Sequence, residues 1–169
     1  MKKLLLTLSL LSLFCITNLN SQNLDHAILI VFNYENGIYR GVFEDEVINT
    51  EGDWYVDRPR YENEFLEEFN KLISKKGGNP RMGVICTPEY LTELGNISAP
   101  IIKIEILTID NKGNLTASVI LQNINNPKLE SSPKIFKCEG GTFGTWLNLV
   151  GDGMEALGSA VGNYARKAL

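Results

Sequence analysis

The chain has 169 residues, and its 20 acidic and 16 basic residues give a formal net charge of −4. It contains no cluster of Lys and Arg that could displace counterions from a phosphate backbone, so the composition argues against a nucleic-acid-binding surface. Residues 23–169 are enough for a single domain with its own hydrophobic core, and no internal repeat or second domain is evident.

The first 22 residues are typical of a secretory signal peptide. Met1 to Lys3 is basic, Leu4 to Ile16 is apolar but too short to span a bilayer as a stable helix, and residues 17–22 are polar or small. We predict cleavage after Ser21 or Gln22 and an exported domain, periplasmic or secreted, over residues 23–169. Beyond the signal, no apolar run has the length of a transmembrane helix.

Cys15 raises the question of a lipid anchor, because acylated lipoproteins begin at a cysteine. The residue before it is Phe14, where lipoprotein signals carry a small residue. We therefore expect no lipidation at Cys15.

The first predicted element of the domain is a strand. His26 to Phe32 is a continuous apolar run, which is typical of a central strand buried on both faces. Residues 35–60 contain several glycines, an acidic triplet and an aromatic-basic string, so we predict a long loop with one short strand at Ile38 to Phe43.

A helix follows over Tyr61 to Lys75, with apolar residues at helical spacing and Gly77-Gly78 as its stop. Arg81 to Cys86 reads as a short strand. The next helix is predicted to start with Thr87 as its cap and Pro88 in its first turn, and to end at Leu94.

Residues 101–122 carry the signature of a β-hairpin. The first strand is β-branched with a period of two, and Asp110 to Gly113 supplies the turn. A four-residue loop would pair Ile109 with Asn114 and leave Lys103, Glu105, Thr116 and Ser118 on the wetter side. The buried face would then combine two sets of side chains: Ile102, Ile104 and Ile106 with Leu115, Ala117, Val119 and Leu121.

The last two predicted elements are an edge strand at Ile135 to Cys138, which follows Pro133, and a C-terminal helix. The apolar stripe of this helix begins at Leu147, and its firm part runs from an Asp152–Glu155 capping box to Ala168. Gly158 and Gly162 weaken that helix, and we attribute them to close approach of the helix to a sheet. The element order predicts an α+β two-layer sandwich with a mixed sheet of four to five strands and helices on one face.

The sequence contains no short motif typical of a catalytic, metal-binding or nucleotide-binding site. His26 is the only histidine, and no metal-ligand spacing, nucleophile elbow or Walker loop occurs, so we assign no catalytic residue, metal or cofactor. The sequence offers two weaker alternatives: a Cys86 thiolate paired with His26, and a phosphate-binding loop at Gly140 to Thr145, which lacks an accompanying Lys or Arg.

Cys86 and Cys138 remain after signal cleavage, in a chain sent to an oxidising compartment. A disulfide between them would close about 50 residues of chain and stabilise the fold by roughly 4 kcal/mol. The alternative is a pair of buried thiols.

The strongest candidate for a functional surface is the stretch around Trp54. Aromatic and arginine side chains in a loop are the types that anchor protein interfaces. In the alternative, Trp54 and Tyr55 fold back onto the core as a lid. The predicted partner-binding residues are Trp54, Tyr55, Arg58, Arg60 and Tyr61.

The order of elements resembles a group of bacterial envelope domains: the N-terminal domain of the Tol translocation protein, the lipoprotein activators of penicillin-binding proteins, and the curli-secretion lipoprotein. The matching pieces are residues 28–32, 65–73, 83–85, 90–91, 102–121 and 155–169. This resemblance implies a non-catalytic module of the cell envelope that binds a protein partner. The alternatives are a small secreted hydrolase and an inhibitor or immunity-type protein, and the sequence leaves the oligomeric state open.

Overall fold

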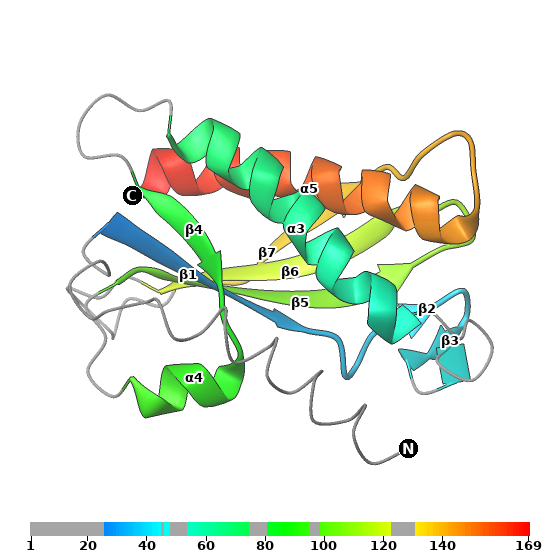
Figure 1. Cartoon of the computed structure of the whole chain (residues 1–169), viewed down its shortest axis with the longest axis horizontal. Helices are drawn as coiled ribbons and strands as arrows, with labels where there is room; N and C mark the ends of the chain where they lie inside the picture. Colours follow the sequence, from blue (N-terminus) through cyan, green and yellow to red (C-terminus); the bar gives the residue numbers. More distant parts are fainter. Residues whose placement is uncertain (1–25, 45, 48–53, 75–80, 95–98, 123–130) are drawn as a thin grey trace, which may run out of the picture.

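The computed structural model describes residues 26–44, 46–47, 54–74, 81–94, 99–122 and 131–169. The predicted signal peptide lies outside these residues. Figure 1 shows the elements, which in chain order are β1 (Ala27–Asn33), β2 (Ile38–Tyr39), β3 (Val42–Phe43), α3 (Trp54–Ile73), β4 (Met82–Ile85), α4 (Pro88–Glu93), β5 (Ile101–Ile109), β6 (Leu115–Gln122), β7 (Lys134–Cys138) and α5 (Trp146–Ala168).

The strands form one mixed sheet, which confirms the α+β class. β1 lies between β4 and β5 and is parallel to both, while β5, β6 and β7 follow one another as antiparallel neighbours. Residues 27–31 of β1 are all buried, as expected for a strand covered on both faces. The sheet has seven strands among the described residues, more than predicted, because β2 joins the far end of β5 at Thr108 and Ile109 and β3 pairs with β2.

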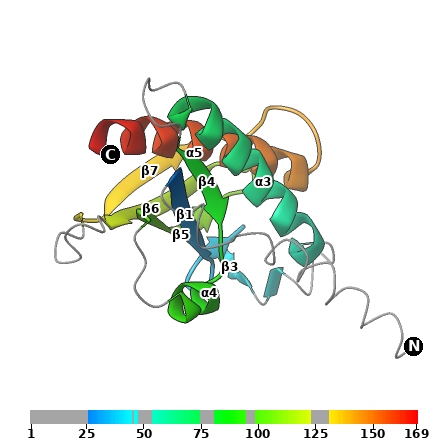
Figure 2. The ribbon, with the colours of Figure 1, turned by 60° about the vertical axis from the view of Figure 1, so that its left-hand side comes forward.

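The two long helices cover one face of the sheet, and the short helix covers part of the other (Figure 2). The main core lies beneath α3 and α5 and includes Ile28, Ile30, Phe65 and Leu157. α4 lies on the opposite face, contrary to the prediction of helices on one face only. A second, smaller cluster explains its position: Ala27, Leu29 and Ala99 are buried there, with Val84, Cys86, Leu91, Leu94 and Ile101 packed against them.

The hairpin has the predicted faces, but its turn is longer. Ile102 pairs with Leu121, and Ile106 pairs with Ala117, as expected. A bulge at Leu107 then shifts the register, so that Ile109 opposes Leu115 and the connection has five residues instead of four. The shift turns Ile109 onto the core face, where it is buried. In the turn, Asp110 Oδ1 accepts hydrogen bonds from the backbone N–H groups of residues 112 and 114, at 2.7 and 3.0 Å.

Both long helices start earlier than predicted. α3 starts at Trp54 and contains Pro59, although the glycines, the acidic triplet and the aromatic-basic string predicted a loop up to residue 60. α5 starts at Trp146, where Thr145 Oγ1 accepts from the N–H of Asn148, and not at Asp152. In both cases a tryptophan at the helix start packs against the rest of the domain, so that tertiary contacts extend the helix beyond its locally favoured start.

The α5 glycines serve contact between helices, which corrects the prediction of contact with the sheet. A Cβ atom built on Gly158 would lie 2.3 Å from the Phe65 carbonyl oxygen of α3. The nearest atoms to a Cβ on Gly162 are also on α3, at 3.2 Å in Leu72 and Phe69. The small residues therefore let the two helix backbones approach each other.

The predicted disulfide is wrong, and the two cysteines are free. Cys86 follows β4 at one edge of the sheet and Cys138 ends β7 at the other. Four strand spacings separate the two edges, about 19 Å, which is far beyond the reach of a disulfide. Burial raises the pKa of each thiol to about 11, so both are protonated near neutral pH.

Candidate functional site

The five residues predicted to bind a partner lie on the first two turns of α3, and the helix divides them between its two sides. Trp54 and Tyr61 are seven residues apart, face the sheet and are buried, so they belong to the core. Tyr55 is 54% exposed, so the lid interpretation fits Trp54 but not Tyr55. The side chains of Arg58 and Arg60 are partly exposed.

Trp54 is the centre of an aromatic cluster that fixes the start of α3. Its indole N–H donates to Glu44 Oε1 at 3.0 Å, which connects the helix to the end of β3. The ring also lies 5.7 Å from the ring of Trp146, centroid to centroid, and so joins the first residues of α3 and α5. Three further rings surround it at centroid distances of 5.5 to 6.3 Å: Tyr34, Tyr39 and Tyr61.

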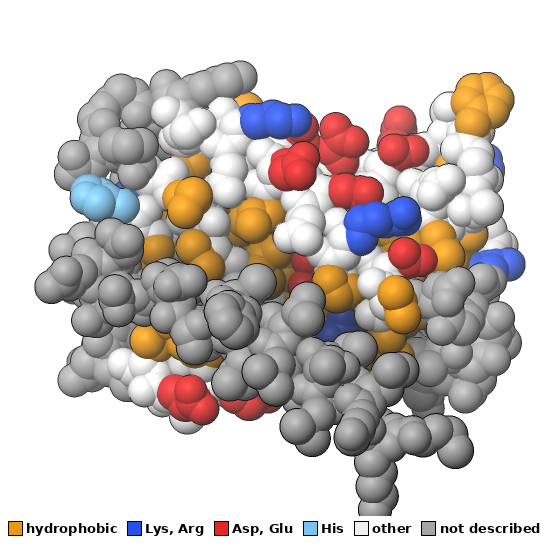
Figure 3. Space-filling view, viewed as in Figure 1, with side chains coloured by type: hydrophobic (Ala, Val, Ile, Leu, Met, Phe, Trp, Pro, Cys, Tyr) orange, Lys and Arg blue, Asp and Glu red, His pale blue; other side chains and the backbone are white. Residues whose placement is uncertain are grey.

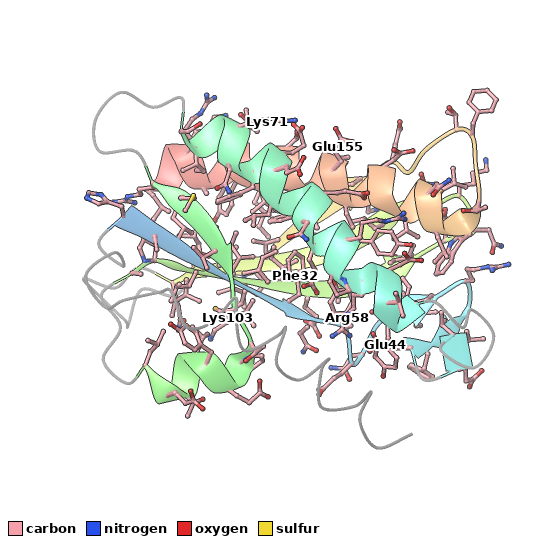
Figure 4. All side chains as sticks on the ribbon, viewed as in Figure 1. Phe32, Glu44, Arg58, Lys71, Lys103 and Glu155 are labelled. Atoms are coloured by element: carbon pink, nitrogen blue, oxygen red, sulfur yellow. The ribbon has the colours of Figure 1, made fainter. Side chains whose placement is uncertain are left out.

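Arg58 is held by charged and aromatic partners at the same place. Its Nη1 donates to Glu44 Oε1 at 3.0 Å, and its Nε lies 3.7 Å from Glu62 Oε1. Its guanidinium carbon lies 4.7 Å from the ring centroid of Tyr34 and 5.7 Å from that of Tyr55. Figure 4 shows Glu44 and Arg58 beside each other at the start of α3. Arg58 therefore presents one fixed orientation and stacks beside the exposed Tyr55.

Two titratable groups next to Arg58 have shifted pKa values. Burial raises the pKa of the Glu62 carboxyl, while the positive charge of Arg58 acts in the opposite direction. Burial also raises the pKa of Tyr34 well above its ordinary value, and the negative charge of Glu62 adds to that shift. Both shifts arise mainly because a charge in the interior is poorly solvated, which is a structural effect and does not require a catalytic role.

Most of the exposed large hydrophobic side chains lie at the same end of the molecule. Ile38 and Phe43 are paired across the β2–β3 ladder, and both are exposed. Tyr55 and Val56 lie in the first turn of α3, and Val56 is 74% exposed. A fifth, Phe143, is 89% exposed on the loop between β7 and α5, which reaches the same end in Figure 1. We call Ile38, Phe43, Tyr55, Val56 and Phe143 the apolar end.

The remaining large hydrophobic residues exposed in the described part of the chain are Met82 and Ile135, at the two edges of the sheet. Sequence reasoning found Tyr55 but missed the other members of the apolar end. An exposed Phe143 between glycines was a usable signal, whereas the exposure of Ile38, Phe43 and Val56 depends on how β2, β3 and α3 pack.

The geometry supports neither of the two chemical alternatives. In the loop at Gly140 to Thr145, the Gly140 N–H donates to Asn114 Oδ1 and the Gly141 N–H donates to the Leu149 carbonyl, so neither is available to a phosphate. His26 precedes β1, and Cys86 lies about five residues further along the parallel strand β4, a separation of roughly 16 Å. Among the described residues, no group of His, Cys, Asp and Glu could hold a metal ion.

Two hollows open on the surface near β4 and α4. One of about 380 Å³ follows the outer edge of β4 between α3 and α4, and includes Leu66, Asn70 and Met82 in its lining. The other, of about 330 Å³, lies on the open face of the sheet and includes Lys103 and Glu105. Lys103 is labelled in Figure 4 above α4.

No family model, curated protein or solved structure matches this chain. The resemblance to bacterial envelope domains therefore stays a prediction from the order of elements. Within the described residues, no helix combines the length and the apolar composition needed to cross a bilayer.

Proposed function

We propose that this protein is an exported accessory protein of the bacterial cell envelope, which catalyses no reaction and holds a protein partner at its apolar end. The observation that carries the proposal is the exposure of Phe43, Tyr55 and Val56 at one end of the molecule, where the Tyr55 ring lies beside Arg58. Aromatic residues and arginine are enriched in the centres of protein interfaces, where they supply large contact area and a polar tip.

The energetic argument depends on the fixed positions of these side chains. Burial of a fully exposed Val or Phe side chain contributes about 1.5–3 kcal/mol, and Phe43 and Tyr55, which are 55% and 54% exposed, would gain roughly half of that. Part of that gain is lost because binding immobilises the side chains involved. Arg58 and Tyr55 already stack on each other, and Glu44 holds Arg58, so this part of the surface is ordered before a partner arrives.

Export and the envelope compartment are supported by the composition of residues 1–22 and by the resemblance described above. An inhibitor or immunity-type protein would use the same apolar end, and the identity of the captured partner separates the two functions. The hydrolase alternative is less well supported, because His26 and Cys86, its candidate catalytic pair, lie far apart.

The test is capture of partners from envelope extracts, followed by affinity measurement with the purified partner. We expect Tyr55→Ala combined with Phe43→Ser to weaken binding at least tenfold, which corresponds to about 1.4 kcal/mol. The matched control is Ile135→Ser, which removes an equally exposed hydrophobic residue from the other side of the sheet. Unchanged affinity in the double variant, or equal losses in both proteins, would remove the apolar end from the function.

A further inference from the structure

Among the described residues, no strand lies beside the outer edge of β4. β4 pairs with β1 on one side, and no other described strand pairs with it. Figure 2 shows β4 running between α3 above and α4 below. An open edge of this kind presents backbone donors and acceptors that a further strand can pair with.

The hydrogen bonds identify which backbone groups face outward. The Cys86 N–H donates to the Ile30 carbonyl on β1 at 2.9 Å, so alternate residues of β4 point towards β1 and the residues between them point away. Gly83 belongs to the outward set, and its N–H donates to Asn70 Oδ1 at 2.7 Å. Ile85, two residues further on, directs its N–H and carbonyl to the same side. The Asn70 amide thus occupies the position that a neighbouring strand would take at Gly83.

An apolar groove of about 380 Å³ runs along this edge. Its hydrophobic lining includes Leu66 on α3 and Met82 and Val84 on β4, and its polar lining includes Asn63 and Asn70. In the described part of the chain, neither Asp, Glu, Lys nor Arg lines it, and burial keeps the Cys86 thiol neutral by raising its pKa to about 11. Figure 3 shows hydrophobic side chains gathered over the β4 region, below the acidic side chains along α3. This uncharged lining offers no partner for a charged side chain, so the segment that best fits the groove is one without charged side chains.

The opposite edge of the sheet has a different character. β7 follows Pro133 and carries Lys134 and Lys137, which are features that discourage pairing at an edge. β4 contains neither a charged residue nor a proline, and Met82 at its start is 61% exposed. The β7 edge thus carries a proline and lysines that discourage addition of another strand, whereas β4 carries neither.

We infer that the β4 edge binds an extended, uncharged segment of a partner protein, which adds to the sheet as a strand. The segment's backbone pairs with the N–H and carbonyl of Ile85, and its alternate apolar side chains enter the groove beside Leu66 and Met82. This site is separate from the apolar end, so it would provide a second point of attachment.

The first experiment uses amide hydrogen exchange in the full exported domain, with a synthetic peptide selected from a phage-displayed random peptide library. We expect the selected peptides to lack charges over an alternating apolar stretch. The Ile85 amide should exchange at least tenfold more slowly when a peptide is bound, because it gains a hydrogen-bond partner. The Cys86 amide is the internal control, since it is already bonded to β1.

The second experiment distinguishes strand addition from simple filling of the groove. N-methylation of the peptide backbone should weaken binding at every second residue only, because a paired strand directs alternate N–H groups towards its neighbour. Met82→Lys should weaken binding at least tenfold, whereas Ile135→Lys, which adds the same charge at an exposed position on β7, should not.

Three results would overturn the inference. The Ile85 amide could keep its free exchange rate when a peptide is bound, or N-methylation could have the same effect at every position, which would indicate an apolar small-molecule type of pocket. The Ile85 amide could also become protected in the protein alone as concentration rises, which would assign the edge to a second copy of this chain. Each result leaves the test of the apolar end unaffected, because that test uses Tyr55 and Phe43.

Discussion

Replacement of Gly158 by alanine tests the packing of α5 on α3, which positions the whole helical layer. A Cβ at this position would lie 2.3 Å from the carbonyl oxygen of Phe65 and 3.0 Å from its carbonyl and α carbons. These are backbone atoms, so no side-chain rotation can relieve the clash and the helices must move apart by about 1 Å. Buried Phe65 and Leu157, both fully enclosed, would lose contacts as a result.

The expected change is a net loss of stability. Alanine favours the helix by about 1 kcal/mol over glycine, and overpacking in a close-packed interior costs up to about 3 kcal/mol. We therefore expect Gly158→Ala to lower the free energy of unfolding by about 2 kcal/mol, or the melting temperature by roughly 4–8 °C for a domain of this size. Urea titration followed by the fluorescence of buried Trp54 measures this change.

Gly162→Ala is the matched control, because its Cβ would meet its nearest neighbours at 3.2 Å, two of them in the flexible Leu72 side chain. We expect a change within about 1 kcal/mol of zero there, since the helix propensity gain offsets a small adjustment. A Gly158→Ala protein that is more stable than the wild type would refute the reasoning, because it would show that α3 and α5 separate without cost.

Three further predictions concern charge and protonation. Burial raises the pKa of Tyr34 well above its ordinary value and that of Cys86 and Cys138 to about 11, so the folded state retains protons that the unfolded chain releases above about pH 9. These three groups should make stability fall as the pH rises from 9 to 11, with a shallower slope in a Cys86→Ala, Cys138→Ala double variant. Identical urea titrations at pH 8 and pH 10.5 would contradict this. Because both thiols are protonated, we expect them to react slowly with a disulfide reagent at pH 7.5 and fully after denaturation. An internal disulfide in the purified protein would contradict the separation of the two sheet edges. Glu44→Ala should lower the free energy of unfolding by about 1–2 kcal/mol, because it removes the hydrogen-bond acceptor of both Trp54 and Arg58. The control, Arg60→Ala, should change the free energy of unfolding by less than about 0.5 kcal/mol, since the ion pairs of Arg60 are long and exposed.

Several features of this fold could be read from local patterns alone. The apolar run of β1 predicted a central strand, and alternation in β5 and β6 predicted which side chains share the buried face. Thr87 and Pro88 predicted the start of α4, and Thr87 Oγ1 accepts from the Tyr90 N–H as expected of a cap. These features depend on residues within a few positions of one another, so the sequence carries the necessary information.

The starts of α3 and α5 could not be read in this way. Local composition placed Trp54 in a loop, because glycines and an acidic triplet precede it and it begins an aromatic-basic string. In the folded chain, Trp54 contacts Trp146 and Glu44, which come from elements that the sequence pattern does not connect to it. The same contacts decide that Trp54 is buried while Tyr55, one residue later, is exposed.

The sequence by itself determined the order of the main elements and which side chains of β5 and β6 share the buried face as far as Ile106, because both follow from periodicities of two and 3.6 residues along the chain. Only the tertiary structure decided that Cys86 and Cys138 lie at opposite edges, that Gly158 faces a helix, and that an apolar groove follows the edge of β4 that no described strand pairs with. Those properties depend on which strands and helices become neighbours, and that choice is made by packing between segments far apart in the sequence.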